Sequence, residues 1–367
     1  MEASPLRNQR DVPVRDRIYL DHASTTPILP EVAAAMADAW ADWANPSSPH
    51  GEGRAARSRL EDARGRIAGA LGWNGTLIFT SGATEAITLA MTSARADRRI
   101  VSPTEHPAVL RLAGKAWKIR VRSDGLVDLD DLAVALQAGR RALVAVQHVN
   151  NETGVVQPLD KIRWLVHAAG GLLLADCAQS AGKLPLPEAD FLAVSAHKLG
   201  GPPGVGALLV RDVATLEAVG GQEGGFRPGT SNLPAILGFA AALEANQDWY
   251  SEAERLRARL GRFVIEAGGE IAAIEAPRIA TIASYRMPGV TSASQLMQLD
   301  LAGIAVSAGS ACSSGSLKAS HVLLAMGWSE EEARETIRIS FGRQTRESDI
   351  DALAAEWRAL SGKRRAA

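Results

Sequence analysis

A lysine follows a buried strand pattern near the middle of the chain. The apolar residues 191–194 lead into Ser195-Ala196-His197-Lys198, and a segment rich in Gly and Pro comes next. Lysine rarely ends a buried strand unless it is paired or reactive. Burial lowers the pKa of an ammonium group and thereby frees its amine as a nucleophile. Taken alone, the segment is equally consistent with a surface lysine in a turn.

An acidic residue occupies a similar position. Asp176 ends the apolar run 172–175 and is followed by Cys177-Ala178-Gln179. A carboxylate at the end of a buried strand needs a cationic partner or several hydrogen-bond donors. A pyridinium nitrogen would be such a partner. The sequence is equally consistent with a structural role for Asp176, as a helix N-cap or a loop residue.

The turn Thr80-Ser81-Gly82-Ala83-Thr84-Glu85 joins an apolar run to a helical pattern. Small residues at a helix N-terminus leave backbone N–H groups free, and such groups bind phosphate. The turn contains neither a Walker lysine nor a G-x-G-x-x-G motif, so it indicates no ATP or dinucleotide site. By itself, such a turn is more often only a tight connection.

The two cysteines differ in their surroundings. Cys312 lies in the Ser/Gly-rich segment 307–316, which is typical of an exposed loop where a thiol can react. Most free cysteines are instead buried as small apolar residues. Cys177 follows Asp176 on an apolar strand and is predicted to belong to the core.

Three further polar positions have no evident structural role. His106 precedes a proline, Asn151 lies in the polar segment 150–152, and Arg338 stands between apolar residues in a strand-like run. An arginine in a half-buried strand suits bidentate binding of a carboxylate. For any single residue of this kind a structural role is the commoner explanation.

In combination, these segments supply a nucleophilic amine, a carboxylate for a ring nitrogen and a phosphate cradle. Those three parts are what pyridoxal phosphate requires of a protein. An imidazole, a guanidinium and a thiol complete the set.

The predicted elements would bring these segments together. Strand-like runs alternate with helical patterns through the first two-thirds of the chain, with strands at 77–79, 142–149, 172–174, 191–194 and 205–210. This alternation predicts an α/β fold with a mostly parallel central sheet and helices on both faces. Ligands of such sheets bind at the carboxyl ends of the strands. A helix predicted over 31–43 would turn one face inward, made of Val32, Ala35, Met36, Ala39, Trp40 and Trp43.

The pattern changes near residue 247. Beyond it, the sequence predicts a charged helix over 252–266, short strands around 279–285 and 304–306, a capping box at Ser329 and an amphipathic helix over 348–360. We therefore predict a large cofactor-binding α/β domain over 17–248. A smaller α+β domain, made of 1–16 and 249–367, would carry the Cys312 loop.

Composition excludes several classes of protein. The 367 residues carry 40 basic and 41 acidic side chains, so no global basic field exists to hold nucleic acid or an anionic membrane. No apolar run is long enough to span a bilayer, and residues 1–17 lack the apolar core of a secretory signal. Two cysteines cannot form a disulfide framework, which favours a reducing cytoplasm.

The chain resembles the cysteine desulfurases of the NifS/IscS type, which are fold-type I pyridoxal-phosphate enzymes grouped with the class V aminotransferases. The resemblance covers nearly the whole chain. Its motifs are Tyr19-Leu20-Asp21-His22-Ala23-Ser24-Thr25-Thr26-Pro27, Asn45-Pro46-Ser47-Ser48-Pro49-His50-Gly51, the Ser-Gly-Ala-Thr-Glu turn, His148-Val149-Asn150-Asn151-Glu152 and Ser310-Ala311-Cys312. Their occurrence in this order is highly specific.

The resemblance implies a role for each matching residue. Lys198 would attach to pyridoxal 5'-phosphate, Asp176 would pair with the ring nitrogen, and Gln179 with the ring oxygen. His106 would stack on the ring and help to move protons. The phosphate would be held by Ala83, Thr84, Ser195 and His197, and by Thr230 of the other subunit of a homodimer. Asn151 and Arg338 would bind the substrate L-cysteine, with Asn151 also near the cofactor, and Cys312 would accept the sulfur as a persulfide for an acceptor protein.

The sequence also departs from the family pattern. Gly224 stands where an arginine is usual, Pro228 where serine is common, and Gly200 where an aromatic residue is often found. Two other readings stay open on the sequence. One is selenocysteine lyase or another class V enzyme; the other is a non-catalytic sulfur-transfer partner that keeps the fold.

Overall fold

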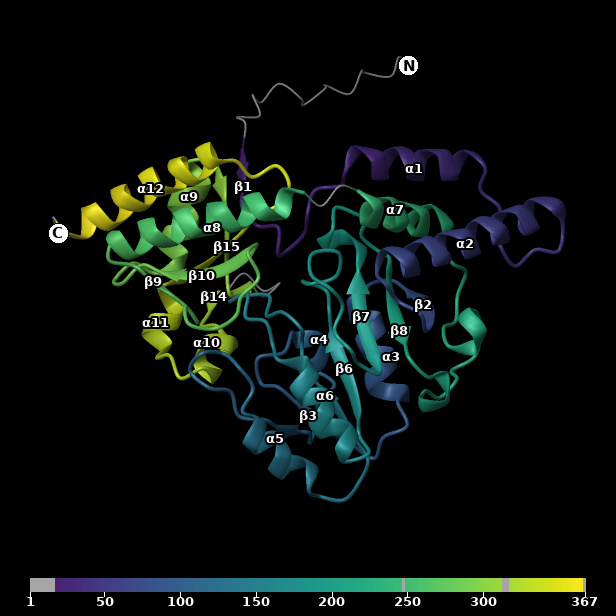
Figure 1. The fold of residues 1–367 in the computed structure, drawn as a ribbon. Coiled ribbons are helices and arrows are strands. Elements are labelled where there is room, and N and C mark those ends of the chain that lie inside the picture. Colours follow the sequence, from purple (N-terminus) through teal and green to yellow (C-terminus); the bar gives the residue numbers. More distant parts are fainter. Residues whose placement is uncertain (1–16, 246–247, 312–316, 366–367) are drawn as a thin grey trace, which may run out of the picture.

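We describe a computed structural model of the chain over residues 17–245, 248–311 and 317–365. Its larger part is built around a seven-stranded sheet in the order β2-β8-β7-β6-β5-β3-β4 (Figure 1). All neighbouring strands pair in parallel except β8, which runs antiparallel to both β2 and β7. The strands are β2 (Thr76–Thr80), β3 (Arg98–Val101), β4 (Trp117–Lys118), β5 (Ala142–Ala145), β6 (Leu172–Asp176), β7 (Phe191–Ser195) and β8 (Gly206–Val210).

Helices cover both faces of this sheet, because its strands are apolar on both sides. Leu173 packs into the core on one face, whereas Leu172 and Leu174 pack into the core on the other. The first core also contains residues of α1 (Pro30–Ala41), α2 (Gly51–Ala70), α5 (Leu129–Leu136), α6 (Leu159–Ala168) and α7 (Leu233–Glu244). The second contains residues of α3 (Ala83–Ser93) and α4 (Pro107–Leu110). The predicted α/β architecture is confirmed.

A smaller part is built around the antiparallel sheet β12-β15-β10-β9. The apolar face of the last helix packs against it through Ile350, Leu353 and Trp357, as the sequence predicts. The strands are β9 (Glu270–Ile271), β10 (Ile282–Arg286), β12 (Ser307–Ala308) and β15 (Thr336–Ser340), with the short pairs β1 (Ile18–Tyr19)–β11 (Ile304–Ala305) and β13 (Ser310–Ala311)–β14 (Leu317–Lys318) beside them. The helices are α8 (Trp249–Glu266), α9 (Ser292–Leu301), α10 (His321–Ala325), α11 (Glu330–Arg334) and α12 (Glu347–Arg365).

Residues 18–20 meet residues from the last quarter of the chain in this smaller part. Ile18 of β1 pairs with Ile304 of β11, and the Ser340 N–H donates to the carbonyl of Leu20. Residues 18–20 therefore lie with the smaller sheet, and the division at residues 17 and 248 stays a prediction. The capping box at Ser329 is confirmed, because its hydroxyl accepts from the Glu332 N–H while the Glu332 carboxylate accepts from the Ser329 N–H. No helix in the described ranges is both long and apolar enough to cross a membrane.

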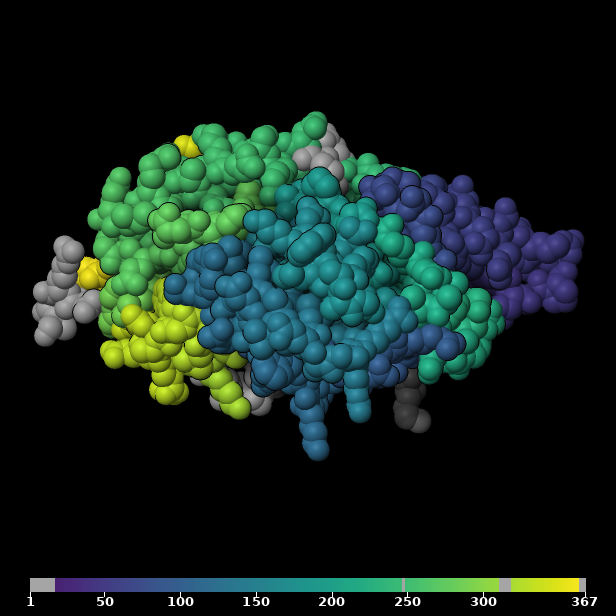
Figure 2. Space-filling model, turned by 60° about the horizontal axis from the view of Figure 1, so that its bottom comes forward, coloured from purple at the N-terminus to yellow at the C-terminus, as the bar shows by residue number. Residues whose placement is uncertain are grey.

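The first helix corrects one expectation. Trp40 and Trp43 were expected to face inward, yet Trp40 is 57% exposed and Trp43, which lies beyond the end of α1, is 42% exposed. The buried stripe of α1 runs through Val32 and Ala39. Trp40 follows Ala39 and so points about 100° further around the helix, away from the core. Helices α1 and α2 extend outward from the rest of the large part (Figures 1 and 2).

Candidate active site

A cleft of about 540 Å³ lies where the carboxyl ends of the large-sheet strands face the smaller sheet. After β5 the chain stays paired with β6 as far as His148, whose N–H donates to the carbonyl of Asp176. The polar segment 150–152, which follows, therefore lies at this edge of the sheet. Thr230 does not line this cleft, and Cys312 lies outside the described residues. The predicted residues that do line it are Ala83, Thr84, His106, Asn151, Asp176, Gln179, Ser195, His197, Lys198 and Arg338.

Lys198 lies in a short 3₁₀ turn, Ala196–Lys198, directly after β7. Its Nζ donates to the carbonyls of Ala23 and Ser24 at 2.6 and 2.5 Å. Burial lowers the pKa of Lys198 to about 8, and the positive charge of Arg338 adds to this effect. The amine is therefore much easier to deprotonate than that of an ordinary surface lysine.

Asp176 ends β6 at the floor of the cleft. Its Oδ1 accepts from the Ala178 N–H at 2.9 Å, and burial raises the pKa of its carboxyl. A cation placed beside Asp176 would favour the ionised form. Gln179 is buried next to it; its Nε2 donates to the Ala23 carbonyl at 2.9 Å, while its Oε1 has no partner among the described residues. Such an orphaned buried atom indicates that a bound group completes the site.

The opposite end of the cleft is the turn before α3. Gly82 adopts φ 147°, which glycine tolerates and other residues rarely adopt, and Ala83 begins the helix. A Cβ on Gly206 of β8 would lie 2.7 Å from the Cα of Gly82, so the turn sits directly on that strand. The free N–H groups at the start of α3 thus face the cleft with Thr84 and Ser195 beside them.

Two histidines of the cleft are held in the neutral form. Burial, with a smaller contribution from the charge of Lys198, lowers the pKa of His106 and of His197 to about 4. The Ala108 N–H donates to Nδ1 of His106 at 3.1 Å, so neutral His106 carries its proton on Nε2. This capping bond is the structural role that the sequence did not reveal. Nδ1 of His197 lies 3.1 Å from Oγ1 of Thr25.

Arg338 projects from β15 into the cleft and ties three segments together. Its Nη2 donates to Oδ1 of Asp21 at 2.8 Å and to Oγ of Ser24 at 2.6 Å. Its Nη1 donates to the Asn151 carbonyl at 3.1 Å. The side chain is 6% exposed, and its Nε has no hydrogen-bond partner in the described part of the chain. A guanidinium with an unused buried donor is suited to an incoming carboxylate.

Other cleft residues were missed from the sequence. His321 lines the cleft at the start of α10, with Nε2 3.0 Å from the carbonyl of buried Glu105. Gly309 also lines it, and a Cβ there would lie 2.2 Å from Oε2 of Glu152. Only glycine fits against that carboxylate at the start of the segment leading to Cys312. A histidine after a Ser/Gly-rich stretch was the only available signal for His321.

Cys177 and the glycines that depart from the family pattern do not line the cleft. Cys177 is fully buried as predicted, and burial raises the pKa of its thiol. Gly200 adopts φ 83°, and a Cβ there would lie 2.6 Å from Cγ of Leu29. The position of Leu29 therefore leaves no room for the aromatic residue often found there. Gly200, Gly224 and Pro228 do not line the cleft.

Comparisons with known proteins place this geometry in a family. The aminotransferase class-V profile matches residues 18–353, so the chain belongs to that family. It is 37% identical over 366 residues to "Cysteine desulfurase IscS 1" of Archaeoglobus fulgidus, covering 91% of this chain and 94% of the relative. Within the class-V family, the chain is a member of the cysteine desulfurases, as its motifs predict.

Solved structures agree with this assignment. A NifS-like protein from Rickettsia africae superposes with a TM-score of 0.86 at 31% identity, covering 94% of this chain and 99% of that one. A structure described as SspA in complex with cysteine gives a TM-score of 0.77 at 30% identity, covering 88% and 98%. These neighbours confirm the predicted fold type.

Proposed function

We propose that the chain binds pyridoxal 5'-phosphate covalently through Lys198 and uses it to remove sulfur from L-cysteine, which leaves L-alanine. The observation that best supports this proposal is the position of Lys198. Its easily deprotonated amine shares one cleft with the Asp176 carboxylate and the N-terminus of α3. When bound, the cofactor supplies an electron sink for the carbon attached to the substrate amine.

The residues of the cleft fit this cofactor at each end. Asp176, whose pKa is raised by burial, would gain a cationic partner in the ring nitrogen. Gln179 lies beside it with an unused oxygen, and neutral His106 offers a flat uncharged face for stacking. The phosphate would be held by the N–H groups of Ala83 and Thr84 together with the side chains of Ser195 and His197.

Arg338 and Asn151 would orient the substrate. The buried Nε of Arg338 would donate to the carboxylate of L-cysteine, while Nη2 stays bonded to Asp21 and Ser24. Asn151 lines the same part of the cleft. The solved relative described in complex with cysteine supports this choice of substrate. Lys198 would hold and return the proton of the substrate carbon.

Cys312 would accept the sulfur. Its thiolate would attack the substrate sulfur, forming an S–S bond while the C–S bond breaks and its electron pair stays with the carbon. A proton then completes alanine, and a persulfide remains on Cys312 for an acceptor protein, such as an iron–sulfur scaffold or a carrier for tRNA thiolation. Strand β12 and Gly309 line the cleft just before this segment, which supports the assignment. A free thiol needs a reducing compartment, so we place the reaction in the cytoplasm.

The activity is tested directly with purified protein loaded with the cofactor. On addition of L-cysteine and a reductant, we expect equal amounts of alanine and sulfide. Pyruvate formation in place of alanine would contradict the proposal, because it would indicate elimination instead of sulfur transfer.

Cofactor attachment should depend on pH through Lys198. Because the pKa of Lys198 is lowered to about 8, its amine is mostly protonated at pH 6 and mostly free above pH 8. The initial rate of attachment to the cofactor-free protein should rise about tenfold per pH unit below pH 8 and level off above it. Stopped-flow absorbance from pH 6 to pH 9.5 measures this, and a rate still rising tenfold per unit above pH 9 would contradict it.

The active unit is proposed to be a homodimer in which each site uses Thr230 of the other subunit. Thr230 is exposed and does not line the cleft of its own chain, which supports this assignment. Mixed dimers of a Lys198→Ala subunit and a Thr230→Ala subunit test it. If the sites are shared, one site combines intact Lys198 with intact Thr230 and should bind the cofactor with normal affinity.

The alternative arrangement gives a different result. If Thr230 served its own subunit, no site of the mixed dimer would hold both intact residues, and cofactor affinity would fall to that of the Thr230→Ala homodimer. The mixed dimers can be isolated with two different affinity tags, and their affinity is measured by titration with the cofactor.

A further inference from the structure

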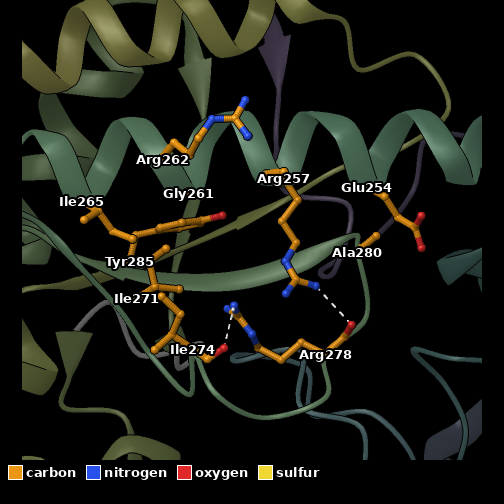
Figure 3. A pocket seen from close by; sticks show the side chains of 11 residues that line it. Glu254, Arg257, Gly261, Arg262, Ile265, Ile271, Ile274, Arg278, Ala280 and Tyr285 are labelled. Carbon is orange, nitrogen blue, oxygen red and sulfur yellow. Dashed lines mark hydrogen bonds between the residues drawn. The ribbon is translucent and has the colours of Figure 1, made fainter.

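A second pocket lies in the smaller part of the molecule, between α8 and the chain that leads into β10 (Figure 3). It has a volume of about 390 Å³, which is within the range of small-molecule sites. It shares no lining residue with the catalytic cleft. The charged side chains that line it are Glu254, Arg257, Arg262 and Arg278, so positive charge is in excess.

Two arginines meet in this pocket. The guanidinium groups of Arg257 and Arg278 approach one another in Figure 3. Arg257 donates through Nη1 to the carbonyls of Arg278 and Ile279 at 3.1 and 2.7 Å, which fixes its position. Burial, together with repulsion from the positive charge of Arg257, lowers the pKa of Arg278 to about 10.

Arg278 has unused donors. Its Nη2 makes a long hydrogen bond of 3.5 Å to the Ile274 carbonyl. Its Nε and Nη1 are buried and have no hydrogen-bond partner within the described ranges. Buried donors of a charged group are nearly always satisfied in folded proteins, so these two indicate a missing acceptor. An anion would supply the acceptor and relieve the repulsion between the two arginines.

The remaining wall is apolar. Ile265, Ile271 and Ile274 line the pocket together with the ring of Tyr285. Ile265 and Ile274 are 52% and 46% exposed, so a ligand body resting on them would remove apolar surface from water. A purely inorganic anion would leave this wall uncovered.

We propose that this pocket binds a small organic carboxylate, with the carboxylate on Arg257 and Arg278 and the apolar body on the three isoleucines. The site is distinct from the desulfurase centre and does not depend on its assignment. It stands on the unused donors of Arg278, on the paired guanidinium groups and on the adjoining apolar wall.

The test uses 4-fluorobenzoate as the probe and the cofactor-loaded protein, with the catalytic cleft saturated by L-alanine. Fluorine NMR should show saturable binding, and an Arg278→Gln variant should weaken it at least tenfold. Arg255→Gln serves as the matched control, because Arg255 lies on the same helix but pairs with Glu252 and Glu347 away from the pocket. That control should bind the probe normally.

Further probes separate the contributions of the charge and of the apolar body, and a second variant tests the apolar wall. 4-Fluorobenzyl alcohol, which lacks the charge, and inorganic phosphate, which lacks the apolar body, should each bind at least tenfold more weakly than 4-fluorobenzoate. Ile265→Glu, at an exposed position, should weaken the carboxylate at least fivefold and decides the matter if Arg278→Gln does not fold. Absence of saturable binding, equal binding of the alcohol, or unchanged affinity in a folded Arg278→Gln protein would overturn the proposal.

Discussion

A Lys198→Ala variant is expected to fold, to hold pyridoxal phosphate only non-covalently and to lose desulfurase activity by about 10³-fold or more. The fold should survive because, within the part of the chain that the structure describes, the Lys198 amine makes hydrogen bonds only to the carbonyls of Ala23 and Ser24. Activity should fail because the variant lacks the amine that is proposed both to attach the cofactor and to move the substrate proton. The visible absorbance of the loaded protein and the rate of alanine formation measure the two losses.

A matched control is provided by Lys183. It is a second partly buried lysine, and burial lowers its pKa to about 7, yet it does not line the cleft. Lys183→Ala should therefore keep the covalent cofactor. Borohydride reduction of the wild-type protein, followed by peptide mapping, should mark Lys198. Recovery of the label on Lys183 would refute the assignment of Lys198 as the residue that attaches the cofactor. A lowered pKa, and not a position in the cleft, would then determine which lysine reacts.

Replacing Cys312 by serine should abolish sulfur transfer while leaving substrate binding intact. The hydroxyl of serine stays protonated near neutral pH and is a poor nucleophile toward sulfur, whereas a thiolate is a good one. We expect alanine formation to fall by about 10²-fold or more, and the absorbance change on addition of L-cysteine to persist. Steady-state alanine assays and spectra of the same preparations check both statements.

Cys177→Ser is the control for the second cysteine. Cys177 is fully buried, so a hydroxyl there costs about 1–3 kcal/mol of stability if it finds no partner. This variant should still turn over and should carry a persulfide on Cys312, detected by mass spectrometry. A persulfide on Cys177, or wild-type alanine production by Cys312→Ser, would favour another class V reaction.

Residues at strand ends were predictable because their position follows from local sequence. Asp176 and Lys198 stand after apolar runs, and parallel strands bring their carboxyl ends to one edge. The small residues before α3 were predictable for the same reason. The roles proposed for Gln179 and Thr230 came from family resemblance, since no local pattern distinguishes them.

Long-range contacts could not be predicted from local sequence. Arg338 reaches Asp21 and Ser24 across more than 300 residues, and only the completed fold creates that pairing. Arg257 and Arg278 likewise look like ordinary charged residues until their elements pack together. The prediction that Trp40 faces inward was wrong, because the hydrophobic character of a residue does not determine which side of its helix packs against the core.

The contact of residues 18–20 with β11 and β15 bears on the order in which the site forms during translation. The large sheet is complete once β8 has been made, so Lys198 and Asp176 can take their places early. Ala23 and Ser24, which accept hydrogen bonds from Lys198, belong to a segment whose anchors are β11 and β15, synthesised much later. The nascent chain therefore holds Lys198 before it holds Arg338, the residue proposed to orient the substrate, so the proposed site is completed only after β15 has been made.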